Sequence, residues 1–206
     1  MAKKIYALPL KKVLELVKNN KTLFKEPLYN KHLLEYYKLI GKSYYILEIK
    51  KFIEFFKLNK DTSYALKILE MFNSKIFINE IAIRLNFSQF KLEELNILEK
   101  DFFYAFIYVL KNIDEELFEL FLEKFFIHYY TTIHMPSNIK INFKEMSIAI
   151  AKTRGLEVKE SFKEISKNLA CFKIIENGKV VVYKEGKSIK TLRKKAFKEY
   201  FQILIH

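Results

Sequence analysis

The chain has little of what disulfide-rich domains, metal sites and turn-rich β proteins depend on. Its 206 residues include 1 Cys, 4 Gly, 3 Pro and no Trp. One cysteine excludes an internal disulfide framework, a four-cysteine iron–sulfur cluster and a zinc finger. So few glycines and prolines disfavour a sandwich of short strands joined by tight turns, and they favour long helices.

Long apolar runs and targeting patterns are also missing. The densest apolar stretch, Phe102–Leu110, has nine residues, whereas a membrane-spanning helix needs about 20. The N-terminal sequence MAKKIYALPLKKVLELVKNN interrupts its apolar residues with lysine and has no signal-peptide core. We therefore expect a soluble protein of the cytoplasm with no membrane partner.

Motifs of the common enzyme classes do not occur in the sequence. It has no GxxxxGK[ST], GxGxxG, HExxH or GxSxG pattern. Its histidines lack a ligand or nucleophile at a useful spacing, and we interpret them as structural; they are His32, His128, His134 and His206. The sequence therefore predicts no catalytic residue, no metal site, no cofactor and no enzymatic activity of its own.

What the chain does have is segregated charge. Residues 1–60 carry 14 Lys against 5 Glu, residues 61–130 carry 7 basic against 12 acidic residues, and residues 131–206 carry 16 basic against 7 acidic residues. A codon bias toward lysine explains the total but not the clustering of acids in the middle. A surface that concentrates positive charge is typical of proteins that bind nucleic acid, because neutralised phosphates release their counterions.

Apolar periodicity predicts helices through the first two thirds of the chain. We expect Gly41 to end one of them as a C-terminal cap, Ser43 to begin the next, and Asp61 and Asp114 to cap two more. The predicted ranges are 9–17, 27–41, 44–58, 63–72, 77–85, 88–110 with a break, and 117–130. The sequence thus predicts a helical domain over residues 1–136.

The periodicity changes after Pro136, which predicts a small α+β module over residues 137–206. Alternating apolar residues indicate a short strand at 139–143, and helical spacing indicates helices at 145–152 and 157–169. Asn177-Gly178 between β-branched runs predicts a type I′ hairpin over 172–183. A basic helix over 189–203 closes the chain. The predicted fold class is mainly α, with this hairpin and basic helix at the C-terminus.

The hairpin and closing helix carry the candidate nucleic-acid site. Residues 173–198 contain nine Lys or Arg and two Glu, and Phe172 and Tyr183 are candidate stacking surfaces. The alternative is that both rings are core and the cations a solvated face. The candidate phosphate-binding residues are Lys179, Lys184, Lys187, Lys190, Arg193, Lys194, Lys195 and Lys198.

The acidic middle of the chain is a candidate docking face for a basic protein partner. Complementary charge accelerates encounter and fixes register, so we expect Glu115, Glu116 and Glu119 to contribute to such a contact. Acids at a helix start also favour the helix dipole, which is the structural alternative.

A second segment resembles a helix-turn-helix. Residues 78–94, within the acidic part, put Ala82 at the close-packing position and Asn86 at the turn. The following helix would present Gln89 and Lys91 to base edges. A helix-turn-helix transcription regulator therefore stays open as an alternative, as does a scaffold protein whose basic ends contact RNA.

The order of several motifs resembles the N-terminal, non-iron–sulfur region of the large subunit of archaeal and eukaryotic DNA primase. Ser43–Asn73 is similar to that family's segment with an Arg-Arg-Tyr-Ala-led helix, and Phe106–Lys111 is similar to its Phe-x-Asp-Tyr-Leu-Lys. Phe172–Tyr200 resembles its strand, glycine turn, strand and closing helix. The chain departs from the family at Tyr108 and Val109, which replace Asp-Tyr, in the spacing before the last motif, and in lacking the cysteine-bearing iron–sulfur domain.

The resemblance implies a helical scaffold with a small α/β module that takes part in DNA replication. In this reading the chain is the non-catalytic subunit of a primase, holding a catalytic subunit and contacting the template or primer. Residue analysis and resemblance thus lead to the same expectation, an accessory protein bound to DNA or RNA.

Overall fold

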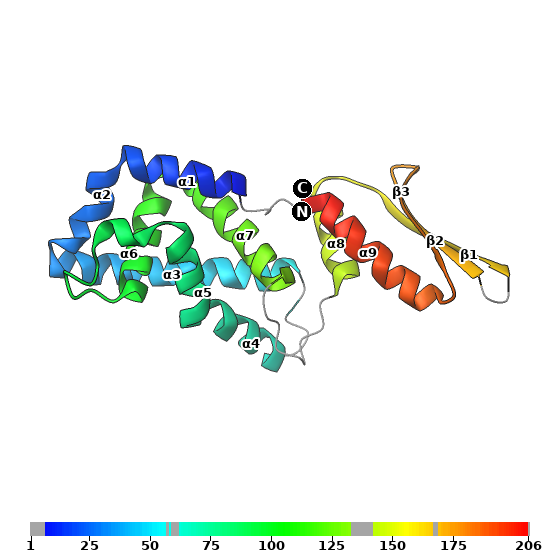
Figure 1. Cartoon of the computed structure of the whole chain (residues 1–206), viewed down its shortest axis with the longest axis horizontal. Coiled ribbons are helices and arrows are strands. Elements are labelled where there is room, and N and C mark those ends of the chain that lie inside the picture. Colours follow the sequence, from blue (N-terminus) through cyan, green and yellow to red (C-terminus); the bar gives the residue numbers. More distant parts are fainter. Residues whose placement is uncertain (1–6, 57, 59–61, 133–141, 167–168, 206) are drawn as a thin grey trace. The chain divides into compact units, whose positions relative to one another are not determined.

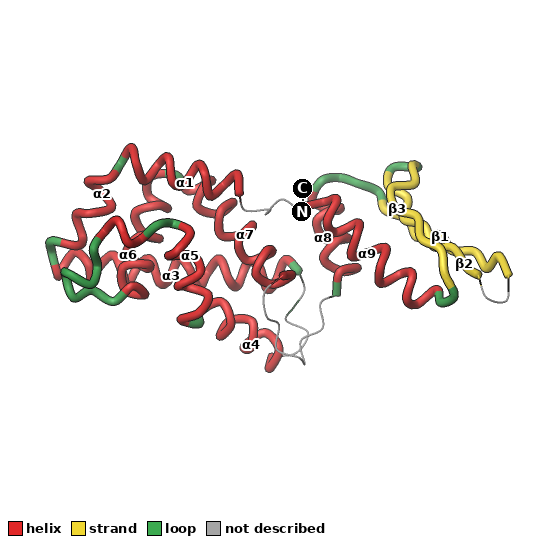
Figure 2. The backbone as a smooth tube through the Cα atoms, in the orientation of Figure 1, coloured by secondary structure: helices red, strands yellow, loops and turns green. Residues whose placement is uncertain are grey.

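The computed structural model describes residues 7–56, 58, 62–132, 142–166 and 169–205. The chain divides into two compact units, residues 1–136 and residues 137–206 (Figure 1). Helices make up most of the first unit, and strands occur in the second (Figure 2). The predicted fold class, mainly helical with a small α+β portion at the C-terminus, is confirmed.

The first unit, the helical unit, is built around the long helix α3. Its helices are α1 (Ala7–Asn19), α2 (Lys21–Lys25), the 3-10 helix η1 (Glu26–Leu28), α3 (Lys31–Phe55), α4 (Thr62–Phe72), α5 (Lys75–Arg84), the 3-10 helix η2 (Phe87–Phe90), α6 (Glu99–Ile113) and α7 (Glu115–Thr132). Helix α3 packs along α6 and also contacts α4 and α7. The expected cap at Asp114 is confirmed, since its Oδ1 accepts a 2.9 Å hydrogen bond from the Leu117 N–H. Asp61 lies outside the described residues.

Aromatic rings fill the core of the helical unit. Phe52, Phe72 and Phe126 are buried and contact one another, with ring centroids 4.5 to 5.7 Å apart. The buried Tyr45 donates a 2.6 Å hydrogen bond from its hydroxyl to the Phe72 carbonyl. Tyrosine therefore adds area to this core without leaving its polar group unsatisfied.

The prediction that Gly41 ends a helix and Ser43 starts another is wrong. Helix α3 runs unbroken through both positions, and the Ser43 hydroxyl donates back to the Leu39 carbonyl at 3.2 Å. A Cβ at Gly41 would lie 1.9 Å from the Tyr104 carbonyl oxygen on α6. Glycine is needed here because the two helix backbones approach closely, which is a packing role that the local sequence does not reveal.

The second unit, the α+β unit, places two helices on one side of a three-stranded antiparallel sheet of order β1-β2-β3. Its elements are α8 (Phe143–Thr153), β1 (Val158–Ser166), β2 (Leu169–Glu176), β3 (Lys179–Gly186) and α9 (Ile189–Ile205). Helix α9 contacts β2, β3 and α8 (Figure 1). The predicted helix at 145–152 and the closing helix are both confirmed. Of the predicted strand at 139–143, residues 139–141 lie outside the described residues, and Phe143 begins α8.

The predicted hairpin is confirmed. Asn177 and Gly178 both have positive φ, 48° and 79°, as a type I′ turn requires. The flanking strands pair from Glu176 opposite Lys179 to Ala170 opposite Gly186. The irregularity between Ile174 and Ile175 leaves the pairing otherwise continuous.

The predicted helix at 157–169 is wrong, because this segment forms strand β1. Val158, Phe162, Ile165 and Leu169 recur at helical spacing, but β1 pairs antiparallel with β2 from Val158 to Ser166. The turn residue Asn177 fixes its start by exchanging two 2.9 Å hydrogen bonds with Glu157. Backbone pairing with the free edge of the hairpin thus overrides the apolar period, and Phe162 stays 63% exposed.

Candidate nucleic-acid interface

The two faces of the sheet differ in what covers them. Alternation along the strands puts Phe172, Ile174 and Val182 on the face that α9 covers, and all three are buried. Phe172 packs against Phe197 of α9, and the Tyr200 hydroxyl donates to Glu176 at 2.6 Å. The core of this unit therefore lies between the sheet and α9.

Of the two candidate stacking rings, one is core and one is exposed. Phe172 is 1% exposed and is held against α9, whereas Tyr183 on β3 is 46% exposed. Neighbouring residues of a strand point to opposite faces, and Tyr183 follows the buried Val182. The structure thus supports the structural reading for Phe172 and leaves Tyr183 accessible to a ligand.

Two of the eight candidate cations are neutralised within the unit. Arg193 of α9 donates from Nε and Nη2 to the Glu160 carboxylate of β1 at 2.7 and 2.9 Å, and Lys144 of α8 reaches the same carboxylate at 2.7 Å. Lys184 of β3 forms an ion pair with Glu199 of α9. These contacts join helices to strands, so Arg193 and Lys184 each have a structural role within the unit.

Charge on Glu160 is stabilised by these partners. Partial burial acts to raise the pKa of Glu160, but the hydrogen bonds from Arg193 and Lys144 outweigh it, so the pKa lies below its ordinary value of 4.5. The carboxylate therefore stays ionised at neutral pH and holds both cations.

The other candidate cations are exposed, and all of them except Lys179 follow β3, with Lys187 just before α9 and the rest on that helix. We call this set the lysine stripe: Lys187, Lys190, Lys194, Lys195 and Lys198. Among the described residues no carboxylate forms an ion pair with any of them. Positions 190, 194 and 198 recur every four residues and so lie on one helix face. Lys179, at the hairpin turn, is also exposed without a described ion pair.

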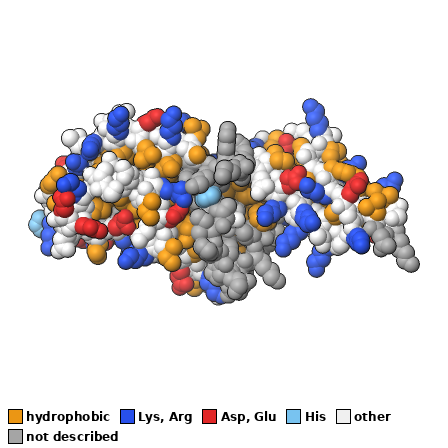
Figure 3. Space-filling model, viewed as in Figure 1, with side chains coloured by type: hydrophobic (Ala, Val, Ile, Leu, Met, Phe, Trp, Pro, Cys, Tyr) orange, Lys and Arg blue, Asp and Glu red, His pale blue; other side chains and the backbone are white. Residues whose placement is uncertain are grey.

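The lysine stripe is unfavourable for α9 taken alone. Like charges at i and i+4 cost about 0.2–0.5 kcal/mol per pair, and a cation near a helix N-terminus opposes the helix dipole by about 0.3–1 kcal/mol. Lys190 lies in the first turn of α9, which contains no acidic residue. A bound polyanion would remove both costs. In the view of Figure 3, Lys and Arg side chains are visible on both units, with Asp and Glu side chains among them.

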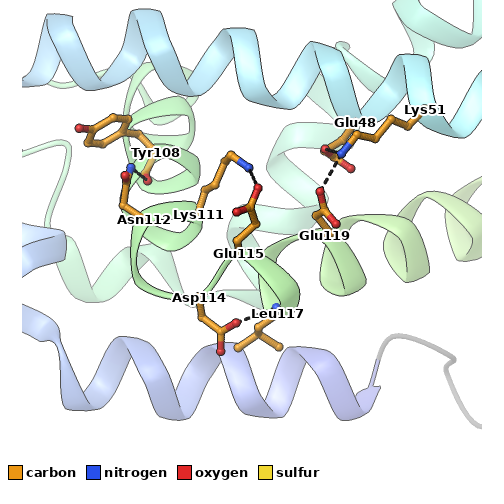
Figure 4. Close-up of polar contacts among 9 residues, drawn as sticks. All are labelled: Glu48, Lys51, Tyr108, Lys111, Asn112, Asp114, Glu115, Leu117 and Glu119. Atoms are coloured by element: carbon orange, nitrogen blue, oxygen red, sulfur yellow. Dashed lines mark hydrogen bonds and ion pairs between the residues drawn. The ribbon is translucent and has the colours of Figure 1, made fainter.

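Two of the three acids predicted to dock a partner form ion pairs within the helical unit (Figure 4). Lys51 of α3 contacts Glu48 Oε1 at 2.8 Å and Glu119 Oε1 of α7 at 2.7 Å. The pKa of Lys51 is raised to about 12, mainly by the hydrogen bond to Glu119 and next by the hydrogen bond to Glu48. Glu119 therefore joins α7 to α3.

The two other predicted docking acids start α7. Glu115 forms an ion pair with Lys111 of α6, and the hydrogen bond from Lys111 lowers the pKa of Glu115. Glu116 is exposed, and no ion pair with it is described. The sequence could not show the pairing of Lys51 with Glu119, which are 68 positions apart, whereas Lys111 and Glu115 have the i, i+4 spacing of a helical ion pair.

The second helix of the helix-turn-helix-like segment does not form. Helix α5 ends at Arg84, and Asn86 adopts a left-handed conformation, φ 55°. The next element is the short 3-10 helix η2, whose Phe87 and Phe90 are buried, and Lys91 ends it with φ 54°. Two buried phenylalanines hold this segment against the core, so it offers no recognition helix for a DNA groove.

No enzyme-like centre stands out in the part of the chain that the structure describes. Within residues 7–56, 58, 62–132, 142–166 and 169–205, no group of three or more His, Cys, Asp or Glu could hold a metal ion. His32 is exposed and His128 is partly exposed on α7, while His134 and His206 lie outside the described residues. None of the described helices is long and apolar enough to cross a membrane.

The chain was compared with known families and proteins. No family model matches it, and no curated protein matches it. The lysine stripe, the accessible Tyr183 and the ion pairs near them are the features of the described residues that bear on function.

Proposed function

We propose that this chain is a non-catalytic subunit that associates with nucleic acid and binds phosphates through the lysine stripe of α9. The observation that carries the proposal is selective pairing. Within one small unit, Arg193, Lys144 and Lys184 are each matched with a carboxylate, while the lysine stripe has no such partner among the described residues. DNA and RNA are both polyanions of the kind that this charge distribution attracts.

The resemblance to the DNA primase large subunit gives the proposal a setting. Such a subunit would hold a catalytic partner, work in the cytoplasm and contribute no catalytic group or cofactor of its own. In the helical unit, the exposed Glu116 is the acid best suited to a basic partner, because Glu115 and Glu119 already pair with lysines of the same unit. Docking through this region remains part of the proposal.

Charge reversal tests the proposal. We expect the quadruple variant Lys190→Glu, Lys194→Glu, Lys195→Glu and Lys198→Glu to weaken binding to a labelled DNA or RNA oligonucleotide at least about tenfold at moderate salt. Arg193 is left unchanged because its loss would break the contact with Glu160. The measurement is fluorescence anisotropy.

A matched control carries the same change of net charge. Four exposed lysines of the helical unit, for which no ion pair is described, are replaced by Glu: Lys12, Lys18, Lys42 and Lys50. We expect this variant to bind nearly as well as the wild type. Equal losses from the two variants would mean that net charge alone attracts the oligonucleotide, and the assignment to α9 would fail.

A further inference from the structure

The face of the sheet opposite α9 has its own pattern of side chains. By strand register, Ser161, Lys173 and Tyr183 lie side by side across β1, β2 and β3. The neighbouring row on the same face places Lys163 beside Cys171 and Glu185. We call this surface the open face. It differs from the lysine stripe, whose residues lie on α9 or, for Lys187, just before it.

Tyr183 is the central aromatic ring of the open face. The Lys173 Nζ lies 5.5 Å from the centroid of its ring, and its hydroxyl donates to the Glu185 carboxylate. One contact is over the ring and the other is at its hydroxyl, and the residue stays 46% exposed. A ring held in this way loses little conformational entropy when a flat group stacks on it.

The charge around this ring is positive. Lys163 is exposed, and no carboxylate partner is described for it. Lys173 contacts the ring face and has no described ion pair, whereas Lys159, one row further along β1, pairs with Glu157 at 2.8 Å. Glu185 accepts a hydrogen bond from the Tyr183 hydroxyl, and Lys163 and Lys173 outnumber this one carboxylate on the two rows. An aromatic ring flanked by cations matches a nucleotide, which presents a flat base and a phosphate within a few ångströms of each other.

We infer that the open face binds a single strand of nucleic acid, with a base stacked on Tyr183 and the adjoining phosphates on Lys163 and Lys173. The occupant has to be single-stranded because bases in a duplex are stacked on one another and do not offer a free face to a side chain. This inference rests on the proposed function and names its substrate class, since a duplex could satisfy the lysine stripe but not Tyr183.

The test compares substitutions at Tyr183 in the full chain. The probe is a fluorescein-labelled oligothymidylate of about 15 nucleotides, near the upper site size of a small single-strand-binding domain. Tyr183→Leu keeps apolar bulk on the strand but removes the flat ring, so we expect its Kd to rise at least about fivefold. Tyr183→Phe keeps the ring, and we expect its Kd to stay within about twofold of the wild type.

Phe162 supplies a matched control. It is an exposed aromatic residue of the same sheet, on the face opposite to Tyr183. Phe162→Leu should leave the affinity unchanged. An unchanged Kd for Tyr183→Leu would overturn the inference, and so would an equal loss for Phe162→Leu. Either result would favour a protein, and not a nucleic acid, as the partner of the open face.

A second pair of measurements guards against misfolding and separates the two proposals. Lys163→Gln with Lys173→Gln should flatten the salt dependence of single-strand binding by about 1.4, which is about 0.7 per lost contact. Photocrosslinking of an oligonucleotide containing 5-iodouracil should label the peptide that holds Tyr183. If the charge-reversed α9 variant keeps its affinity and is still labelled on that peptide, the open face is upheld and the assignment of phosphate binding to the lysine stripe is contradicted. Labelling confined to α9 would contradict the open face alone.

Discussion

The two units use their cations differently. Residues 1–136 carry 21 basic against 17 acidic residues, and residues 137–206 carry 16 basic against 7 acidic residues. In the helical unit, Lys38 contacts Asp101 at 3.1 Å and also pairs with Glu35, while Lys51 joins Glu48 and Glu119. In the α+β unit, carboxylates pair with Lys144, Lys159, Lys184 and Arg193, and the lysine stripe is among the cations for which no ion pair is described.

This difference helps to distinguish two origins of the positive charge, a lysine-rich codon usage and a surface that serves a function. A lysine-rich codon usage would enrich both units in cations, and it accounts for the high lysine content of each. It does not explain why the acids that neutralise lysines are abundant in one unit and scarce in the other. The surplus on α9 supports the proposal of a polyanionic ligand.

The largest effect is expected at the packing of the helical unit. Gly41→Ala should lower the free energy of unfolding by about 3 kcal/mol or more, because a Cβ would meet the Tyr104 carbonyl at 1.9 Å and α3 would have to move away from α6. Helix propensity alone predicts a gain of about 1 kcal/mol for the same change. Urea unfolding monitored by circular dichroism measures whether the free energy of unfolding falls or rises. Ser43→Ala is the exposed control, and a stabilised Gly41→Ala would contradict the close approach.

A smaller loss is expected where the helical unit neutralises its own charge. Lys51→Met leaves the Glu48 carboxylate, which is 8% exposed, without its cation. We expect this to lower the free energy of unfolding by about 2 kcal/mol. Lys50→Met, at an exposed neighbour with no described ion pair, should change it by less than about 0.5 kcal/mol. Similar values for the two variants would show that the pairing of Lys51 is incidental.

The ion pair that ties β1 to α9 should make the α+β unit sensitive to acid. The pKa of Glu160 is lower in the folded chain than its ordinary 4.5, so the carboxylate contributes stability above that value and loses it as the pH falls through the lowered pKa. Glu160→Gln should cost about 1 kcal/mol at pH 7 and remove this part of the pH dependence. Glu164→Gln on the same strand is the control, and the readout is thermal unfolding between pH 7 and pH 3. If the melting temperature of Glu160→Gln falls with acid as steeply as that of the wild type, this ion pair is not the source of the acid sensitivity.

The smallest effect has the opposite sign. Lys194→Gln removes a cation that has like charges at both i−4 and i+4, and so should stabilise the chain by about 0.3–1 kcal/mol. Lys184→Gln loses the pair with Glu199 and should not stabilise it. The difference between the two melting temperatures at low salt is the observable. It should shrink when salt is added, since both effects are electrostatic. A destabilised Lys194→Gln would mean that the stripe is not under repulsion.

Local sequence signals predicted the elements whose stability is decided locally. Asn177-Gly178 specifies its own turn, Asp114 satisfies the N–H three residues on, and the apolar face of α9 repeats along one helix. Each of these depends on residues only a few positions apart, and each was predicted correctly.

Elements decided by distant partners were predicted wrongly. Gly41 responds to the backbone of α6, and β1 responds to the free edge of β2 and to Asn177. The same limit applies to the candidate site. The sequence named the cations but could not separate Arg193 and Lys184, which carboxylates hold, from the lysine stripe. It also missed the open face, because a helix at 157–169 would have scattered Lys163 and Ser161 around its circumference.

The central claim is that phosphates bind the uncompensated lysines of α9 and not the cations of the helical unit. The most direct test is the slope of log Kd against log salt for a single-stranded oligonucleotide, measured for the wild type and for two neutralised variants. Replacing Lys190, Lys194, Lys195 and Lys198 by Gln should flatten the slope by about 2 to 3, because each lost contact removes about 0.7. Replacing Lys12, Lys18, Lys42 and Lys50 by Gln should leave the slope unchanged. Equal slopes for the wild type and the α9 variant would contradict the claim.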